Sequence, residues 1–337
     1  MSMIKYTHKL GAHCESSTVA TLLNYYDVDI SEAMIFGISG TIFFAYLNSP
    51  MMHFPTFALR DRSGKIYSNV TSYLGPKFHT ARFKNKEKAM YELDRLLEEG
   101  HPVGVQVDFF YMEYIPAFAR AHFNGHYVIV VGKENGDYIV SDCYAPVLAR
   151  VGEETMKIAR FARGTFSPGG FMFYKPDCPQ NMNYKKAIVK GIKHASFYNL
   201  RLPVPIFGVR GIRYFAKELL KWPSYARDAE HFSDEIMLVN VILEERGTGG
   251  GGFRYLYASF LQEAADILGE PALREVAEKM MANGDEWRMV SLHAGRIGKE
   301  RNLGRDSLME LGKMLNKRAD VEEKLFKELS AIVKHHK

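Results

Sequence analysis

The sequence predicts an α+β protein in which a mixed region of helices and strands precedes an all-helical region. Up to about residue 178, segments with helical periodicity alternate with short β-branched runs, and beyond it the helical periodicity continues almost without interruption. A polar stretch with two prolines, KPDCPQNMN at residues 175–183, separates the two regions. Because 337 residues exceed what one hydrophobic core usually holds, we predict two domains, residues 1–178 and 179–337.

The elements expected in the first region follow from the spacing of its apolar residues. Apolar positions three and four residues apart predict helices over residues 14–26, 86–99 and 154–163. Residues 132–137, which contain Asn-Gly, indicate a hairpin turn between two strands. The β-branched runs predict strands at Val103–Asp108, His126–Val131, Tyr138–Asp142 and Phe171–Tyr174.

The second region is expected to be helical throughout. Its clearest segment is residues 253–268, where apolar side chains form one continuous stripe. Two further helices are expected over residues 306–318 and 320–334. The glycine-rich residues 249–252 are the one low-complexity stretch of the sequence, and we expect them to form a loop.

Composition restricts the class of protein. Hydrophobic residues make up 47% and charged residues 25%, as in ordinary globular domains. The sequence has no run of about 18 apolar residues, and its first residues lack the apolar stretch of a secretory signal, so neither a membrane span nor export is expected. Three cysteines are too few for a disulfide framework, which favours a cytoplasmic location.

The net charge of +5 is unevenly distributed. Residues 1–180 contain equal numbers of basic and acidic side chains, whereas residues 185–227 contain ten Lys or Arg and the single acid Glu218. Such a segment can attract an acidic partner, or it can be a solvated helical face. It contains no nucleic-acid-binding motif, so nucleic acid is not expected as a partner.

A cysteine, a histidine and an aspartate have the order of a catalytic triad. Cys14 begins a predicted helix, where the helix dipole and unpaired backbone N–H groups favour a thiolate and can stabilise an oxyanion. His126 begins one predicted strand and Asp142 ends the next, so a hairpin places the two side chains together as base and orienting group. Cys143 and Cys178 are expected to be packing or surface thiols, and no metal site is predicted.

The order of these motifs resembles two families. A cysteine at a helix start, followed later by a histidine strand and an aspartate, is similar to the papain-like peptidases fused to bacteriocin-exporting ABC transporters. A closer resemblance is to the butirosin-biosynthesis protein H family of aminoglycoside antibiotic clusters. The matching stretches are His13-Cys14, YYDVDISEAMIFGISG, PVGVQVDFFYMEY, GHYVIVVG with SD after it, and GTGGGGFRYLYASFLQEAADIL.

The resemblance implies a fold and an activity. It implies a papain-like cysteine peptidase-type N-terminal domain followed by an all-helical C-terminal domain. It also implies an acyltransferase of antibiotic biosynthesis, in which Cys14, His126 and Asp142 move an acyl group from a carrier-protein thioester to a small-molecule amine acceptor. An acidic acyl carrier protein would be the partner. No cofactor is expected, because phosphopantetheine would enter only as part of the carrier-bound substrate. A papain-like hydrolase (peptidase, amidase or thioesterase) and a non-catalytic binding protein on the same fold are the alternatives.

One position departs from the papain-like pattern. Those peptidases usually have a glutamine six residues before the cysteine, which donates to the oxyanion, and this sequence has His8 there. His8 or His13 could donate in its place, the backbone alone could serve, or both histidines could have no role in the chemistry.

Four further residues are candidates for substrate binding. Asp108 ends a predicted strand, and Tyr111 and Tyr114 follow it in a segment that lies near the active site in the resembling family. Asp108 could hold a cationic amine and the tyrosines could line its pocket, or Asp108 could cap a turn and the tyrosines could be core residues. Arg254 follows the glycine-rich loop at a helix start, where it could meet a phosphate or carboxylate.

Overall fold

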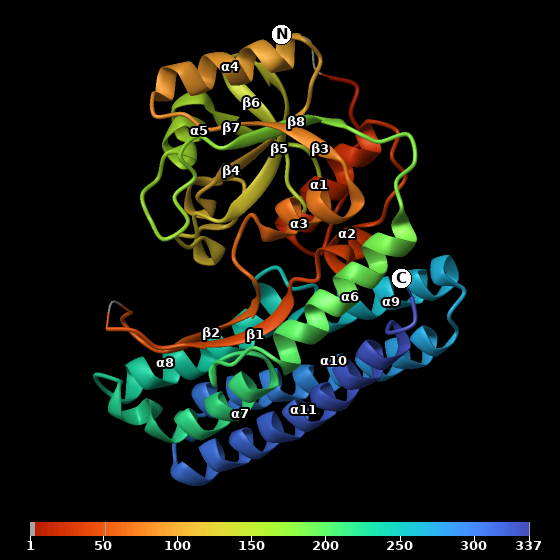
Figure 1. Ribbon diagram of the computed structural model, residues 1–337. Coiled ribbons are helices and arrows are strands. Elements are labelled where there is room, and N and C mark those ends of the chain that lie inside the picture. The colour runs from red at the N-terminus through yellow and green to blue at the C-terminus, as the bar shows by residue number, and fades with distance from the viewer. Residues whose placement is uncertain (1–3, 51, 337) are drawn as a thin grey trace. The chain divides into compact units, whose positions relative to one another are not determined.

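The structure is a computed structural model that describes residues 4–50 and 52–336 (Figure 1). It is an α+β protein, as predicted, and it divides into two compact units. The first unit comprises Met1–Ile35 and Ser63–Met182, and the second comprises Phe36–Arg62 and Asn183–Lys337. The last boundary between the units lies between residues 182 and 183, within the polar stretch of residues 175–183. The segment of residues 36–62 belongs to the second unit.

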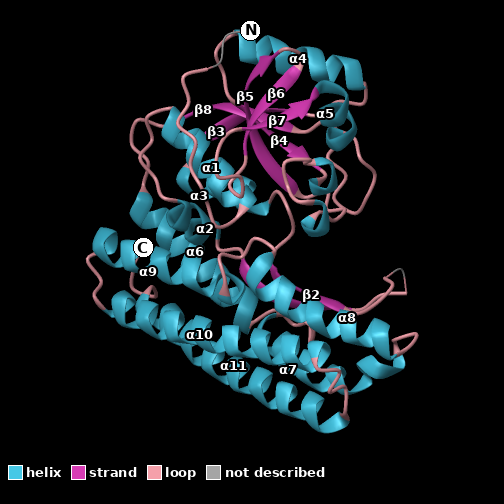
Figure 2. Cartoon of the chain, turned by 180° about the vertical axis from the view of Figure 1, so that it is seen from behind, coloured by secondary structure: helices cyan, strands magenta, loops and turns pink. Residues whose placement is uncertain are grey.

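The first unit is built on a six-stranded antiparallel sheet (Figure 2). Its strand order is β3-β8-β4-β5-β6-β7, so that the strands carrying the predicted histidine and aspartate are neighbours near one side. All four strands predicted from β-branched runs are present, with shifted ends. The strands are β3 (Lys77–Ala81), β4 (Val103–Val107), β5 (His126–Glu134), β6 (Asp137–Ser141), β7 (Ala149–Gly152) and β8 (Met172–Asp177).

Helices cover both faces of this sheet. Val103, Val105 and Val107 point into a core shared with α4 and α5, whereas Gly104, between them, faces Leu22 of α1. The side chain of a residue at 104 would meet Leu22, so the absence of a Cβ lets α1 approach the sheet closely. The helices are α1 (Cys14–Tyr25), α2 (Glu32–Ser39, which continues into the second unit), α3 (Lys65–Leu74), α4 (Lys86–Glu98) and α5 (Glu153–Arg160), with short 3₁₀ turns η1 (Phe109–Tyr111) and η2 (Ala117–Ala119).

The β5–β6 hairpin has the tight turn that its sequence predicts. Asn135 and Gly136 have φ of 52° and 89°, the left-handed conformation that both central residues of a type I′ turn require. The register pairs Glu134 with Asp137 next to the turn and Ile129 with Ser141 towards the other end. The start of β5 and the end of β6 are thereby brought to the same end of the hairpin.

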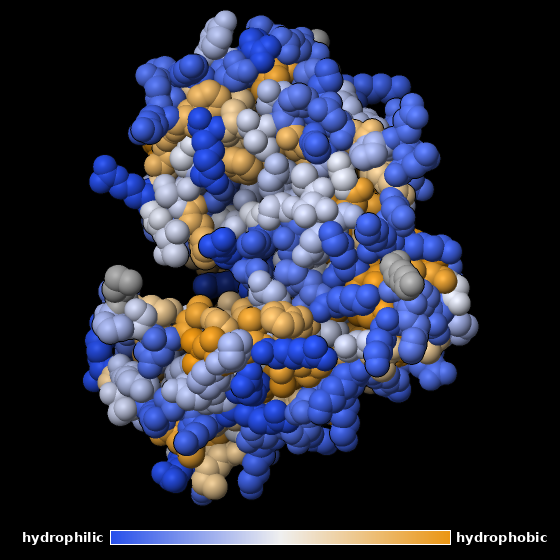
Figure 3. Space-filling model, viewed as in Figure 1, coloured by the Kyte–Doolittle hydropathy of each residue, from blue (hydrophilic) through white to orange (hydrophobic). Residues whose placement is uncertain are grey.

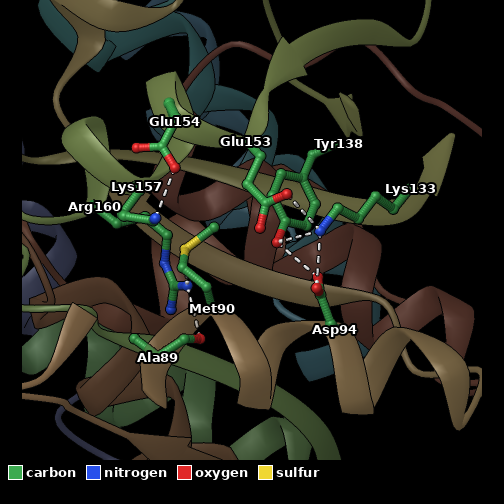
Figure 4. A network of polar contacts seen from close by, with 9 residues as sticks. All are labelled: Ala89, Met90, Asp94, Lys133, Tyr138, Glu153, Glu154, Lys157 and Arg160. Atoms are coloured by element: carbon green, nitrogen blue, oxygen red, sulfur yellow. Dashed lines mark hydrogen bonds and ion pairs between the residues drawn. The ribbon is translucent and has the colours of Figure 1, made fainter. Parts of the chain in front are cut away.

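A polar network attaches this hairpin to α4 and α5 (Figure 4). The ammonium group of Lys133 on β5 lies 2.8 Å from Asp94 on α4 and 3.1 Å from Glu153 on α5. The hydroxyl of Tyr138 on β6 donates to the same Asp94 carboxylate at 2.6 Å. One carboxylate thus receives a donor from each strand, which fixes the hairpin against the helix.

The second unit contains a hairpin that the sequence analysis did not predict. Strands β1 (Ile42–Leu47) and β2 (Thr56–Arg60) pair in antiparallel fashion, and their aromatic side chains pack against helices of the same unit. The Phe57 ring lies 5.2 Å from that of Phe215, and the indole N–H of Trp222 donates to the Tyr46 hydroxyl. Aromatic burial of this kind explains why residues 36–62 belong with the C-terminal helices.

The rest of the second unit is helical, as predicted. Residues 306–318 and 320–334 were expected to form separate helices, but residues 306–332 lie in the single helix α11, because Ala319 between the two segments does not interrupt a helix. The elements are α6 (Tyr184–Leu200), α7 (Gly208–Glu218), η3 (Leu219–Ser224), α8 (Ala229–Asn240), a π-helical turn η4 (Val241–Glu245), η5 (Gly251–Phe253), α9 (Arg254–Leu268), α10 (Ala272–Lys299) and α11 (Arg305–Ile332).

The exposed surface and the hydrophobicity of the helices are those expected from the composition of an ordinary globular protein. In Figure 3 hydrophilic residues predominate on the visible face, with hydrophobic patches among them. Among residues 4–50 and 52–336, the structure has no helix with the length and apolar character needed to cross a membrane.

Candidate active site

Cys14 is the first residue of α1, as predicted, and only 2% of it is exposed. The turn before it is held by Glu32, a residue that the sequence analysis did not select. The Glu32 carboxylate accepts the backbone N–H groups of Ala12 and His13 and the hydroxyl of Ser16, each at 2.8 Å. Because the N–H groups of residues 12 and 13 are used in this way, a backbone donor to a substrate oxygen would have to come from the first turn of α1, which begins at Cys14.

The structure brings His126 and Asp142 together at the open end of the hairpin. Nε2 of His126 lies 2.7 Å from Oδ2 of Asp142, and both side chains are at most 2% exposed. The His126 ring also hydrogen-bonds the Cys14 side chain. Since Nε2 faces the carboxylate, Nδ1 is the ring nitrogen left for the sulfur. The three side chains thus form a connected chain of acceptor, base and nucleophile.

The charges of this chain stabilise one another. Burial on its own lowers the pKa of His126, but its electrostatic interactions with Asp142 and Cys14, and the hydrogen bonds that the ring donates to both side chains, raise it to about 10. Burial also raises the pKa of Asp142, yet the His126 charge and three hydrogen bonds hold it below its ordinary value. This electrostatic balance favours the imidazolium form of His126 beside the Asp142 carboxylate.

Tyr114 is bound to the triad, contrary to the expectation that it lines a substrate pocket. Its hydroxyl donates to Oδ2 of Asp142 at 2.6 Å, while the backbone N–H of Tyr144 donates to Oδ1 at 3.1 Å. Burial and the Asp142 charge raise the pKa of Tyr114 well above its ordinary value, so the phenol stays a donor. Asp142 therefore accepts three hydrogen bonds that fix the orientation of its carboxylate.

Two aromatic rings enclose the imidazole. Phe109 meets the His126 ring edge to face at 4.9 Å, and Tyr144 stacks on it at 5.7 Å with an interplanar angle of 17°. These contacts restrict the rotation of His126 and keep water away from it.

The two histidines proposed as oxyanion donors have different surroundings. Both ring nitrogens of His8 lie 2.8 Å from protein partners, the Ser141 hydroxyl and the Ala145 carbonyl oxygen. These contacts attach His8 to the segment around Asp142 and leave it no ring nitrogen for an oxyanion. His13 is 4% exposed and precedes α1 in extended conformation. The structure thus favours the backbone alternative for the oxyanion site over a role for His8.

Asp108 organises a loop, which corrects the expectation that it holds a cationic amine. It is 1% exposed and accepts four hydrogen bonds. The donors are the backbone N–H groups of Phe110 and Phe123, the amide of Asn124 and the ring of His122. With both oxygens engaged, it caps η1, as the alternative interpretation required. Tyr111 packs against the core of the first unit, as the alternative for the tyrosines proposed.

Arg254 does meet a carboxylate, but an internal one of the second unit. It is 1% exposed and forms a bidentate pair with Glu322, at 2.8 and 3.0 Å. Its guanidinium also lies 4.6 Å from the centre of the Trp287 ring. The sequence analysis therefore placed Arg254 correctly at a helix start but was wrong to expect it to face a ligand.

The other two cysteines have the roles expected of packing thiols. Cys143 is buried, and burial together with the Asp142 charge raises the pKa of its thiol well above the ordinary value. Burial raises the pKa of Cys178 as well. Both thiols are thus held in the protonated, unreactive form.

Fold and site together define the class of protein: the first unit is a papain-like cysteine enzyme fold. Its α1 presents the cysteine to a histidine and an aspartate on adjacent antiparallel strands. The chain belongs to the family described as domain of unknown function DUF4872, which matches residues 154–329. Residues 13–143 match butirosin biosynthesis protein H, N-terminal, which confirms the resemblance found in the sequence.

Comparison with solved structures finds a Bacillus anthracis protein described as a C39-like peptidase. Its sequence is 14% identical, the TM-score is 0.34, and the match covers 54% of this chain and 96% of that one. Comparison with curated proteins finds no match.

Proposed function

We propose that this protein is a cysteine-dependent acyltransferase that moves an acyl group from a thioester to an amine. The observation that supports it most directly is the buried chain from Cys14 through His126 to Asp142. An activated cysteine next to a base is suited to acyl transfer, because it forms a covalent acyl-enzyme and divides one difficult step into two.

In the first step, the Cys14 thiolate attacks the carbonyl carbon of the thioester. A new carbon–sulfur bond forms, the bond to the leaving thiol breaks, and the His126 imidazolium gives its proton to that thiol. In the second step an amine attacks the acyl-enzyme and His126 takes its proton. The Cys14 thiolate then leaves, and the imidazolium–thiolate pair is restored. The backbone N–H of Cys14 stabilises the oxyanion in both steps.

Two findings favour transfer to an amine over hydrolysis. Cys14 and His126 are each 2% exposed and the imidazole lies between two aromatic rings, an environment that limits attack by water. The N-terminal match is to butirosin biosynthesis protein H, a name that denotes a biosynthetic protein and so fits bond formation better than hydrolysis. The hydrolase alternative uses the same three residues and differs only in the acceptor.

The proposed donor is carried by an acidic carrier protein that docks on the basic segment of residues 185–227. Within this segment, Arg213 is already paired with Asp320 and Glu323, and Lys221 with Glu218. Lys185 and Lys186 at the start of α6 are exposed, with no ion pair among the residues the structure describes. They are therefore the side chains that we expect an acidic partner to contact.

The test is to incubate the protein with a panel of acyl cysteamine thioesters and to measure its intact mass. We expect an acyl adduct on Cys14, which disappears when a primary amine is added and the acyl-amine product forms. Cys14→Ala should give no adduct, while Cys143→Ala, the matched control at the neighbouring buried thiol, should still give one.

The products distinguish the alternatives. Release of free acid at the same rate with and without amine would identify a hydrolase. Absence of an adduct on Cys14 with every thioester, together with resistance to iodoacetamide at neutral pH, would identify a non-catalytic protein and contradict the proposal.

A further inference from the structure

The first unit contains a cavity that the proposed chemistry does not use. Its volume is about 480 Å³, within the range of small-molecule sites, and its lining includes none of the three triad residues. It lies on the opposite side of β5 from the catalytic base, because Tyr127, which lines it, directly follows His126 and successive side chains of a strand alternate. Gln106 on β4 pairs with Tyr127 and lines the same cavity.

Arg82 supplies the charge of this cavity. Among the described residues that line it, Arg82 is the one with a charged side chain, and the lining includes no carboxylate. Its guanidinium lies over the Phe171 ring, 4.6 Å from the centre, and donates one hydrogen bond to the Pro168 carbonyl oxygen at 3.0 Å. In residues 4–50 and 52–336 it forms no ion pair with a carboxylate. Arg82 is exposed to solvent, and these two contacts hold its guanidinium in place with N–H donors left for a ligand.

Aromatic rings and hydroxyl groups form the remaining walls. The rings of Tyr67, Tyr127, Phe166 and Phe171 contribute to the lining, together with serine and threonine side chains. Rings of this kind favour a flat, unsaturated body, and the hydroxyls can bond to its polar substituents.

Hydrogen bonds from β4 and from the end of α5 hold the loop whose residues 164–167 form one wall of the cavity. The Gln106 side-chain amide donates to the carbonyl oxygens of Asn124, at 2.8 Å, and of Phe166, at 2.7 Å. At the end of the loop, the buried Arg160 donates to the Gly170 carbonyl oxygen at 3.2 Å and accepts the N–H of Gly170 at 3.0 Å. The cavity is thus largely formed before any ligand binds, which reduces the entropic cost of binding.

We propose that this cavity binds a small aromatic carboxylate, whose carboxylate group contacts Arg82 and whose ring lies among the four aromatic side chains. The planar guanidinium matches a carboxylate with two parallel hydrogen bonds. A cationic ligand is disfavoured, because Arg82 would repel it and no acidic side chain of the lining would offset that. The proposal concerns binding alone and does not depend on the acyltransferase activity.

The test is isothermal titration of the full chain with para-hydroxybenzoate, para-hydroxybenzamide and inorganic phosphate. We expect the carboxylate to bind about two- to fivefold more tightly than the uncharged amide, because the amide loses a charge-assisted pair with an exposed arginine. Arg82→Gln should weaken carboxylate binding by a similar factor. Ser68→Phe, which places a ring into the cavity from the exposed side of α3, should abolish it.

Arg120→Gln is the matched control, because Arg120 also lies over a phenylalanine ring, that of Phe110, but is outside the cavity. It should bind para-hydroxybenzoate like the unchanged protein. Equal affinity for carboxylate and amide, or unchanged binding by Arg82→Gln, would overturn the assignment of Arg82. Phosphate binding as tight as that of the aromatic carboxylate would overturn the role of the rings. Failure of all three probes to bind would overturn the site.

Discussion

Replacement of Asp142 by asparagine is the most informative change at the triad. All three partners of the carboxylate are donors: the His126 ring, the Tyr114 hydroxyl and the Tyr144 backbone N–H. An amide has nearly the same volume but offers only one acceptor oxygen. In either orientation its NH₂ group faces at least one of these donors, so at least one buried hydrogen bond is lost and the negative charge disappears.

The size of the effect follows from the pKa of His126. Its rise from 6.5 to about 10 corresponds to about 5 kcal/mol in favour of the imidazolium, and Asp142 is the largest cause of the rise. Asp142→Asn should therefore lower this pKa towards 6.5 and reduce the rate at neutral pH by about 10² to 10⁴. The raised pKa stabilises the folded protein fully below about pH 6.5, and this stability is lost as the pH rises through 10. The Asp142→Asn variant should lack most of this contribution to stability.

Two measurements check this reasoning. Titration of the His126 ring by ¹⁵N NMR should show the lowered pKa directly, and the alkaline limit of kcat/KM should move from about pH 10 to a lower pH. An unchanged His126 pKa together with a rate within a few-fold of the original would refute the role of Asp142. Full activity restored by added zinc would show that the carboxylate acts as a metal ligand instead.

Three further predictions concern other parts of the chain. Tyr114→Phe should reduce the rate and lower the alkaline limit of kcat/KM, because one of three hydrogen bonds to the carboxylate is lost. Both effects should be smaller than those of Asp142→Asn. An unchanged pH profile would assign Tyr114 a packing role only. Glu322→Gln should destabilise the second unit by about 3–5 kcal/mol, as expected when a buried ion pair loses one partner. The neighbouring half-exposed Glu323→Gln should cost about 0–1 kcal/mol, and urea unfolding followed by fluorescence of the two tryptophans checks both, with equal losses contradicting the argument. The double variant Lys185→Glu, Lys186→Glu should raise KM for a carrier-bound donor but not for an acyl cysteamine. Added salt should have the same effect on the unchanged protein. Equal kinetics for both donors at all salt concentrations would discard carrier docking.

The sequence predicted those parts of the fold and site that local patterns specify. Cys14 at a helix start could be recognised because the apolar spacing after it is regular, and α1 begins there. The contact between His126 and Asp142 could also be foreseen. Their separation of sixteen residues is spanned by one hairpin, and Asn135-Gly136 is a strong signal for its turn.

The misassigned residues have partners far away in the chain. Tyr114 was expected in a pocket and instead contacts Asp142, 28 residues later, and Arg254 pairs with Glu322, 68 residues later. No pattern within a window of the sequence identifies such a partner, because side chains this far apart meet only after the intervening elements have packed. The same reason explains why residues 36–62 were assigned to the wrong part of the chain.

The sequence by itself therefore determined the class of fold, the helical character of the second region, the place of Cys14 at a helix start and the contact between His126 and Asp142. Each of these depends on periodicity or on a single turn, interactions that act over a few residues. Tertiary structure alone decided which polar groups are already occupied. Asp108 and His8 resembled ligand contacts until their hydrogen-bond partners were known. Glu32 gave no signal at all, although it holds the turn before Cys14. A buried polar group must find a partner somewhere in the fold, and only the packed chain specifies which one.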